Sequence, residues 1–206
     1  MSAVLSRHPQ RNALRLELRQ NQILRGVPQA TWDDIEPRLE IAEFRKGDLL
    51  VNQGSREMEQ FFILGGILKR VVSNPEGKEM ILRFAAENDM DTSYAAWRLK
   101  TRVPYSIVAV TKVRVARMPM PQWVEFIERQ PEVKARFEYE VMRLMSEVMA
   151  HTITLHLLDA PGRLARFKRK HEDLTGRIPN KELASYLNLT PETLSRLKQR
   201  RRQSER

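Results

Sequence analysis

The chain has 206 residues, of which 41% are hydrophobic and 30% are charged, so it can fill a core and is not expected to be disordered throughout. Its formal net charge of +10 favours a polyanionic partner, and the absence of cysteine excludes disulfides, thiol nucleophiles, cysteine-bound zinc and cysteine-held iron–sulfur clusters. No apolar run approaches the ~20 residues of a membrane span and the first residues lack a secretory signal, so we expect a cytoplasmic protein without membrane contact.

The first elements along the chain are two short helices. Residues 13–25 carry leucines with the spacing of one helix face. These are Leu14, Leu18 and Leu24. A second helix is predicted to begin with Thr31 as its N-cap, because two acidic residues follow it, and to end near Leu39.

The middle of the chain changes to short β-rich runs separated by turn signals at Gly47, at the pair Gly65-Gly66 and over residues 74–77. The runs predicted as strands lie within residues 41–54, 61–73, 79–84, 105–110 and 113–118. Several short strands at this spacing predict a small antiparallel sandwich or barrel.

A long helix follows. From Pro131 to Leu158 there is no Gly and no further Pro, which predicts one helix roughly 42 Å long. It carries a seam with alternating spacings of four and three residues, as in a coiled coil. The seam residues are Phe137, Val141, Leu144, Val148, His151, Leu155 and Leu158.

Two packing arrangements are open for this helix. Because it is too long for a small domain to cover, we expect the seam to pair with that of a second copy. The alternative is a helix that lies with this seam against its own barrel. A second stripe, made of Met142, Met145 and Met149, is expected to face the barrel, since methionine packs against irregular surfaces.

The C-terminal quarter is the most basic part of the chain. Residues 159–162 stop the long helix and are interpreted as a hinge. Residues 159–206 carry 13 Lys and Arg against 6 Asp and Glu, a net charge of +7. This segment is either a solvated basic tail or an ordered domain that contacts a polyanion.

Two helices with a tight break between them are predicted in this basic segment. Asn180 is expected to cap the first helix and Thr190 the second, with Pro191 at the first helical position. Six residues have the spacing needed to pack the two helices across each other: Leu183, Ala184, Leu187, Leu189, Leu194 and Leu197. The pattern predicts a helix-turn-helix whose second helix enters a DNA major groove, the alternative being a plain helical hairpin with a solvated basic face.

The second helix carries side chains suited to reading DNA. Glu192 can accept a hydrogen bond from a cytosine amino group, Arg196 can donate two to guanine, and Ser195 can reach a base or a phosphate. The residues expected at phosphates, which carry no sequence information, are Asn180, Thr190, Thr193, Lys198, Arg200, Arg201 and Arg202.

Taken in this order, the elements resemble the Crp/Fnr family of bacterial transcription regulators from Ile23 onward. The matching stretches are residues 44–48 with Gly54, 62–66, 74–79 and, most specifically, 189–196. The resemblance implies that Glu192, Ser195 and Arg196 touch bases of half-sites related to TTGA in an inverted repeat. It also implies a homodimer on double-stranded DNA, with RNA polymerase as a further candidate partner.

The resemblance further implies an α+β protein of three parts. Residues 1–130 would form an N-terminal antiparallel β-roll of the cyclic-nucleotide-binding type, with an N-terminal helix. Residues 131–158 would form a dimerisation helix, and residues 159–206 an all-α helix-turn-helix domain. Only residues 198–206 follow the reading helix, too few for the β-hairpin wing of the family, so a wingless subgroup is expected.

The stretch that would bind a cyclic nucleotide departs from the family pattern. Pro104 and Tyr105 stand where members that bind cyclic AMP place the phosphate arginine, and Asp89 and Asp91 would repel a phosphate. We therefore do not expect control by cyclic AMP, and the identity of any effector is left open. The residues expected to line an effector pocket are Asp91, Thr92, Tyr94, Tyr105 and Ser106.

Catalysis and cofactors are not expected. The four histidines lack metal-ligand spacing, so neither a metal nor haem is predicted, and no Ser/His/Asp order or phosphate loop indicates an enzyme. His151 in the seam could make dimerisation sensitive to acid. The remaining alternative function is a ligand-sensing module that has lost specific DNA binding, against which the intact set of Glu192, Ser195 and Arg196 argues.

Overall fold

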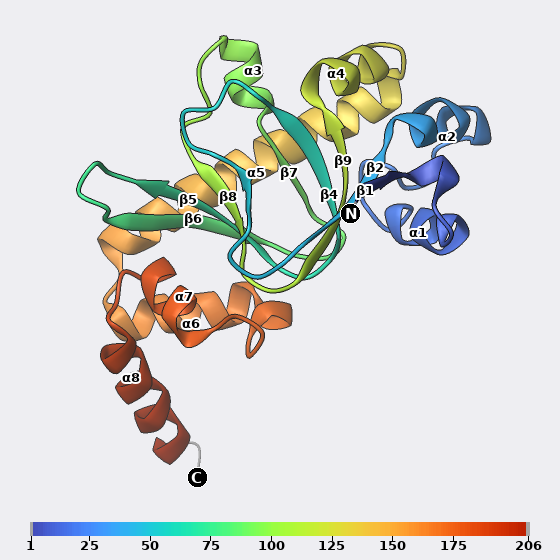
Figure 1. The fold of residues 1–206 in the computed structure, drawn as a ribbon. Helices are drawn as coiled ribbons and strands as arrows, with labels where there is room; N and C mark the ends of the chain where they lie inside the picture. Colours follow the sequence, from blue (N-terminus) through green and yellow to red (C-terminus); the bar gives the residue numbers. More distant parts are fainter. Residues whose placement is uncertain (1, 205–206) are drawn as a thin grey trace.

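The protein is described here by a computed structural model that places the backbone of residues 2–204 and the side chains of residues 2–200. In this part of the chain, the strands form two antiparallel sheets with the orders β1-β2-β9-β4-β7 and β3-β8-β5-β6 (Figure 1). The strands are β1 (Ser2–Val4), β2 (Glu40–Phe44), β3 (Leu49–Val51), β4 (Glu59–Gly65), β5 (Leu68–Ser73), β6 (Glu79–Ala85), β7 (Met90–Thr92), β8 (Ser106–Ala109) and β9 (Val113–Pro119). The two sheets form a β-roll, which confirms the antiparallel architecture predicted from the turn spacing.

The N-terminal helices differ from the prediction in their bounds. The first, α1 (Arg11–Leu18), follows a 3-10 turn η1 (Leu5–Arg7) and ends well before residue 25. It ends early because the Asn21 side chain accepts a hydrogen bond from the Ile23 backbone N–H at 2.9 Å and so closes a local turn. Leu24 is nevertheless fully buried, so the apolar pattern located the core correctly although not the helix end.

The prediction of Thr31 as a helix cap is wrong. The second helix, α2 (Gln29–Ile35), has its N-cap three residues earlier, at Pro28, and a 3-10 turn η2 (Glu36–Arg38) follows it. Thr31 lies inside the helix and is buried, and its hydroxyl donates to the Gln130 side chain at 3.1 Å. The proline ends the preceding loop and starts the helix without a side-chain cap.

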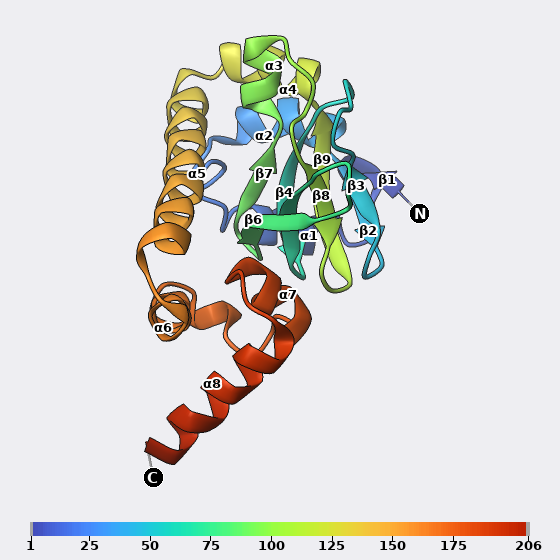
Figure 2. The same ribbon diagram turned by 90° about the vertical axis from the view of Figure 1, so that its left-hand side faces the viewer.

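A single long helix, α5 (Pro131–Leu157), runs along one side of the β-roll, as the sequence predicted (Figures 1 and 2). Two shorter helices, α3 (Tyr94–Leu99) and α4 (Met120–Glu128), lie at one end of the roll. The sequence pattern did not predict α3. After Leu158 the chain turns, and Asp159 caps the next helix by accepting from the Gly162 backbone N–H at 2.9 Å, which confirms the predicted stop.

The C-terminal helices lie beside the second sheet (Figure 2). They are α6 (Ala160–Lys170), the 3-10 turn η3 (Glu172–Leu174), α7 (Asn180–Tyr186) and α8 (Pro191–Ser204). Their buried side chains form one cluster with Val71, Ile81 and Phe84 of the β-roll. The helical segment therefore shares its core with the outer face of β5 and β6. None of the helices in residues 2–204 is both long and apolar enough to cross a membrane.

Candidate nucleic-acid interface and ligand pocket

The chain forms a well-defined, hydrogen-bonded turn between α7 and α8. Asn188 adopts a left-handed backbone conformation with φ of 52°, which asparagine tolerates better than most residues. The Leu189 backbone N–H donates to the Ala184 carbonyl at 2.9 Å. Thr190 then caps α8, since its hydroxyl accepts from the Thr193 backbone N–H at 3.2 Å. The predicted cap and the predicted start at Pro191 are confirmed.

Helices α7 and α8 pack against each other through the side chains that were predicted from their spacing in the sequence. Leu183, Ala184, Leu187 and Leu194 are at most 5% exposed, and Leu189 and Leu197 pack against them from the edge. Because this packing fixes α8 against α7, the opposite face of α8 is held rigidly toward solvent.

Three polar side chains that the sequence assigned to base reading stand on this outer face. Glu192, Ser195 and Arg196 are all exposed, in the first turns of α8. The Glu192 backbone N–H and the Thr190 hydroxyl lower the pKa of the Glu192 carboxyl group, so that this side chain is an anionic acceptor at neutral pH. One carboxylate, one hydroxyl and one guanidinium group are thus presented together, which is a chemistry suited to base edges.

The residues predicted at phosphates have different surroundings. Asn180 does not cap α7, because Pro179 takes the cap position. The side-chain oxygen of Asn180 instead accepts a hydrogen bond from the Lys198 ammonium group at 2.6 Å. Thr190 and Arg200 are exposed, and Thr193 is half-buried. The side chains of Arg201 and Arg202 lie outside the described residues.

Arg163 joins three segments and was not found by sequence reasoning. Its guanidinium group donates to the carbonyls of Leu155 and Leu158, at 2.9 Å each, and to that of Leu187 at 3.1 Å. One side chain thereby satisfies free carbonyls at the end of α5 and at the end of α7. An arginine in a basic segment gives no sequence signal for such a role.

Two ion pairs and one aromatic stack attach α7 and the loop before it to the rest of the molecule. Lys69 of β5 contacts Glu182 at 2.8 Å, and Arg177 contacts Glu87 at 2.7 Å. The ring of Tyr186 packs between elements, with Phe84 of β6 at 5.1 Å between ring centroids and His151 of α5 at 3.7 Å. The placement of α7, and of α8 packed on it, therefore depends on both α5 and the β-roll.

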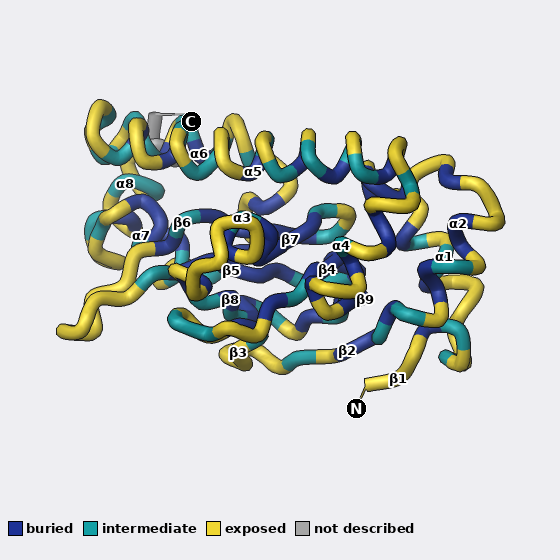
Figure 3. Tube along the Cα trace, turned by 90° about the horizontal axis from the view of Figure 1, so that it is seen from above, coloured by how far each residue is buried: buried dark blue, intermediate teal, exposed yellow. Residues whose placement is uncertain are grey.

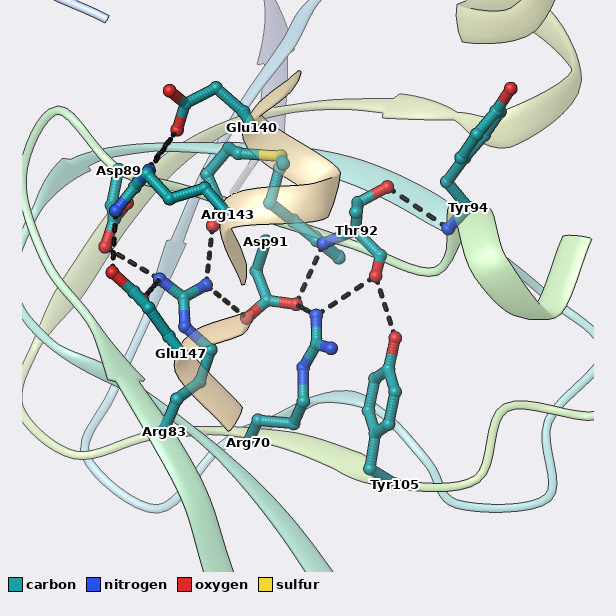
Figure 4. A network of polar contacts seen from close by, with 12 residues as sticks. Arg70, Arg83, Asp89, Asp91, Thr92, Tyr94, Tyr105, Glu140, Arg143 and Glu147 are labelled. Carbon is teal, nitrogen blue, oxygen red and sulfur yellow. Dashed lines mark hydrogen bonds and ion pairs between the residues drawn. The ribbon is translucent and has the colours of Figure 1, made fainter. Parts of the chain in front are cut away.

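A cluster of buried arginines and carboxylates lies between the β-roll and α5 (Figure 4). Arg70 of β5 pairs with Asp91 and donates to the Thr92 carbonyl at 3.1 Å. Arg83 of β6 contacts Asp89 at 2.9 Å and Asp91 at 3.4 Å. Asp89 and Asp91, which were expected to repel a phosphate, are thus already paired with guanidinium groups of the same chain.

The cluster continues onto the long helix. Arg143 contacts Asp89 at 3.1 Å and also pairs with Glu140 and Glu147 on its own helix, at 2.7 and 2.8 Å. Within the cluster, four carboxylates face three guanidinium groups (Figure 4). The ion pairs tie α5 to the loop before β7 and leave no net positive charge for an anionic ligand.

Beside this cluster is a cavity of about 260 Å³. Arg70, Thr92 and Tyr105 form its polar end, and its other walls come from Leu82 of β6, from α3, from residues 101–104 and from α5. Burial raises the pKa of the Tyr105 phenol, which stays protonated and donates to the Thr92 carbonyl at 2.7 Å.

Two of the five residues expected in an effector pocket lie at this cavity. Thr92 and Tyr105 line the cavity. Asp91 is used in the ion pair with Arg70, Tyr94 packs its ring on Phe137 at 4.9 Å, and Ser106 accepts from the Gln53 backbone N–H at 3.0 Å. These three side chains already have partners within the fold and do not line the cavity.

The seam predicted for dimerisation packs instead within its own chain. Phe137 and Leu144 are at most 2% exposed, His151 is 8% exposed, and Val141 and Val148 pack against the same core. Leu155 and Leu158 are half-buried. The alternative in which the seam covers the chain's own barrel is the arrangement observed, because the roll and α7 together are long enough to cover the seam.

The outer face of α5 is exposed to solvent (Figure 3). It carries a second apolar stripe, part of which the sequence had assigned to the barrel. We define the outer stripe of α5 as Tyr139, Met142, Met145, Met149, Ile153 and Leu157, which are between 48% and 77% exposed. The expectation that these methionines face the barrel is wrong for Met142 and Met149, which are 64% and 63% exposed, whereas Met145 lies at the edge of the stripe and also lines the cavity beside the β-roll. The described residues contain no group of three or more His, Asp or Glu side chains arranged to hold a metal ion.

Comparisons with known proteins agree with this arrangement. A cyclic nucleotide-binding domain model matches residues 41–130, which covers most of the β-roll and α4. The nitrogen fixation regulation protein FixK of Bradyrhizobium diazoefficiens is 23% identical over 164 residues, which are 74% of this chain and 68% of FixK. The cAMP-activated global transcriptional regulator CRP of Salmonella typhimurium is 22% identical over 126 residues, 61% of this chain and 60% of the CRP chain.

The fold is shared with solved regulators. The structure of FixK2 from Bradyrhizobium japonicum superposes with a TM-score of 0.71 at 13% identity, covering 81% of this chain and 86% of FixK2. At this identity the likeness concerns the fold. The order of β-roll, long helix and C-terminal helices is thus that of a known architecture.

Proposed function

This chain carries a cyclic nucleotide-binding domain, is homologous to the transcription regulators FixK and CRP and has the fold of Crp/Fnr family regulators, and from this premise we propose that it regulates transcription as a DNA-binding homodimer. In this proposal residues 1–130 form the sensor domain, 131–158 the dimerisation helix and 159–206 the DNA-binding domain. Such a regulator acts in the cytoplasm and is a candidate contact of RNA polymerase.

The observation that carries the proposal is the outer face of α8. Glu192, Ser195 and Arg196 are exposed together at the start of a helix that is fixed from behind by buried leucines. A helix of this kind presents its N-terminal residues to base edges in the major groove. We assign the three side chains to bases of half-sites related to TTGA.

The contacts to the DNA backbone are assigned by position. Thr190, Thr193, Asn180, Lys198 and Arg200 flank the reading face on α7 and α8. The hydrogen bond between Asn180 and Lys198 holds these two side chains together at the helix crossing. Cationic and polar groups at such positions contact phosphates and set the register of the protein on DNA.

Dimerisation is assigned to the outer stripe of α5, in place of the seam chosen from the sequence. Six large apolar side chains are exposed along a single helix face, which is unusual for a monomer. A second copy packing against this stripe would bury them and join two reading helices into one molecule. The dimer must place those helices about 34 Å apart to read an inverted repeat.

Control by cyclic AMP is not part of the proposal. Arg70 and Arg83 of the β-roll lie where they could have bound an anion, but each is engaged by Asp91 or Asp89. A cyclic phosphate would have to displace these carboxylates, and the buried Asp91 would then be left uncompensated.

The proposal is tested by selecting genome fragments with the purified protein, with and without an extract of cell metabolites. The expected result is enrichment of an inverted repeat with TTGA-like halves, bound by two copies of the chain. Enrichment of no common sequence, or binding by a single copy, would contradict the proposal. A change of affinity caused by the extract would reveal that a small molecule acts on the protein.

A further inference from the structure

We propose that a surface groove between α3 and the edge strand β3 is a docking site for an extended segment of a partner protein, in which acidic side chains adjoin apolar ones. Helix α3 lies at the end of the molecule opposite α8, so the groove is separate from the proposed DNA-reading face (Figures 1 and 2). The inference does not depend on the DNA binding proposed above. It starts from a group of cationic side chains and from one exposed tryptophan.

The groove consists of two adjoining hollows, with volumes of about 520 and 580 Å³. Arg56, Met58 and Trp97 line both hollows and so join them. Leu49 and Trp97 on the walls are 49% and 37% exposed, which shows that the groove is open along the surface. Two open hollows in series suit a chain that runs through both better than one compact molecule.

Hydrogen bonds fix the loop on one side of the groove to the segment on the other. The Gly54 backbone N–H donates to the Val103 carbonyl at 2.7 Å, and the Val103 N–H donates to the Ser55 carbonyl at 3.0 Å. The Arg102 guanidinium group donates to the Gly54 carbonyl at 2.9 Å. The groove therefore has its shape before a partner binds, which lowers the entropic cost of association.

The first hollow is cationic. Among the described residues, Arg56, Lys100 and Arg102 line it without any acidic residue, and none of the three forms an ion pair with a carboxylate. In contrast, Arg117 at the far end of the groove is paired with Glu59. Neighbouring cations without counterions repel one another and attract carboxylates. Charge complementarity therefore assigns the acidic side chains of the partner to the first hollow.

The second hollow is suited to apolar side chains. Its two arginines are balanced by two glutamates, and its apolar walls come from Leu49, Leu50, Val51, Met58, Trp97, Pro119 and Pro121. Trp97 is the exposed one of three tryptophans, since the other two are fully buried. Tryptophan and methionine are enriched at protein interfaces, and tryptophan often carries a large share of the binding energy.

Strand β3 gives the groove a wall to which an extended chain can bind. It is the end strand of its four-stranded sheet and pairs on one side with β8. Side chains of a strand alternate between two faces, yet the consecutive residues 49–52 all line the second hollow, so this hollow follows the edge of the strand. An edge strand offers backbone donors and acceptors to a further strand. The partner segment is therefore extended rather than helical.

The test uses the full chain and a fluorescein-labelled peptide that has a run of valine and phenylalanine with glutamates on both sides. We expect saturable binding of one peptide per copy, measured by fluorescence anisotropy, and an affinity that falls as the salt concentration rises. A peptide with lysine in place of each glutamate is expected not to bind. Absence of saturable binding, or equal binding of both peptides, would overturn the proposal. Displacement of the acidic peptide by a single-stranded oligonucleotide would assign the groove to nucleic acid instead.

The cationic hollow is tested by Lys100→Glu, at an exposed position. This variant should bind the acidic peptide about fivefold more weakly. Lys78→Glu is the matched control, because it makes the same change of charge at an exposed position in the turn between β5 and β6, outside the groove. Its affinity should stay within about twofold of that of the unchanged protein. Equal losses in the two variants would show that net charge, and not this groove, attracts the peptide.

The position of the apolar part is tested through Trp97. The unlabelled peptide should shift the tryptophan emission to the blue and protect it from quenching by acrylamide, because Trp32 and Trp123 are already buried. In Trp97→Ala this change should disappear and the affinity should fall about tenfold. Unchanged emission at saturation, or an unchanged affinity of Trp97→Ala, would show that the peptide binds elsewhere.

Discussion

His151 of the long helix and Tyr186 of α7 stack face to face, with ring centroids 3.7 Å apart and planes only 2° apart. The two residues belong to segments that the proposal assigns to dimerisation and to DNA binding. Because His151 is buried, a charge on its imidazole ring is disfavoured, and burial lowers its pKa to about 4. The contact between the two segments therefore contains a titratable group held in its neutral form.

This burial predicts a loss of stability in mild acid. In the unfolded chain the pKa of His151 returns to its ordinary value of 6.5. Between that value and about 4 the unfolded state binds a proton that the folded state does not, so the free energy of unfolding falls as the pH falls through this window. Urea unfolding between pH 7.5 and 4.5 measures the effect.

Replacing His151 by Phe keeps an aromatic ring against Tyr186 and removes the titration. The slope of stability against pH should become shallower in His151→Phe but not vanish, because nearby His171 is also shifted to a lower pKa by burial. Lys170 and His171 face His151 and add repulsion to its charged form. The control is His156→Gln, at an exposed position of the same helix. A variant His151→Phe with the slope of the unchanged protein would show that His151 is not the group responsible.

The buried ion pair of Arg70 and Asp91 predicts that removal of the Asp91 carboxylate strongly lowers the stability of the fold. Both side chains are at most 4% exposed, so Asp91→Ala leaves a buried guanidinium group without its main partner. We expect the free energy of unfolding to fall by about 3–5 kcal/mol. Denaturant titration at neutral pH measures this loss.

The exposed pair of Glu43 and Lys112 is the matched comparison. These side chains also contact each other, at 2.8 Å, but are 48% and 73% exposed. Glu43→Ala should change stability by no more than about 1 kcal/mol, because water solvates whichever partner remains. If the two variants lost equal stability, the assigned difference in burial between the two ion pairs would be wrong.

The sequence located the local features of the fold better than the long-range ones. The cap at Thr190 and the stop at Asp159 could be predicted because each depends on contacts within three residues. The cluster around Arg70 could not, since its partner Asp91 lies 21 residues away on a strand of the other sheet. The sequence did contain one signal for this cluster, because Lys69 and Arg70 interrupt an otherwise apolar β-rich run.

The long helix shows why periodicity alone does not identify a partner. Its sequence contains two apolar stripes, one through Phe137 and Leu144 and one through Met142 and Met149, and helical spacing describes both. Which stripe faces the β-roll depends on the aromatic rings of Tyr94 and Trp123, which pack on Phe137. Those rings come from elements far away in the sequence, so the heptad pattern could not select the inward face.

The base reading proposed for α8 predicts that replacing Arg196 changes sequence preference. Arg196→Ala should cost about 1–3 kcal/mol of binding free energy per half-site and should relax the preference at one base pair of each half-site. Competitive binding to the selected repeat and to its single-base variants measures both quantities. Unaltered sequence preference in this variant would remove Arg196 from the set of base-reading residues.

Arg200 provides the contrasting case on the same helix. A side chain that contacts a phosphate contributes equally to all sequences, so Arg200→Ala should weaken binding to specific and random DNA alike. It should also reduce the slope of log affinity against log salt by about 0.9 per lost phosphate contact. A change in sequence preference without a change in this slope would assign Arg200 to base reading instead.

The dimer proposed through the outer stripe of α5 predicts which substitutions separate two copies of the chain. Met142 is 64% exposed at the middle of the stripe, and a carboxylate there would be buried against its equivalent in a second copy. Met142→Glu should therefore give a monomer by light scattering and lose the inverted repeat, while its thermal unfolding as a single chain changes little. Leu16→Glu, at a position of α1 that is 63% exposed, introduces the same charge away from α5 and should leave the dimer intact. A dimer that survives Met142→Glu but not Leu16→Glu would place the contact between copies on the N-terminal helices, and the reading helices would then need a different geometry to reach two half-sites.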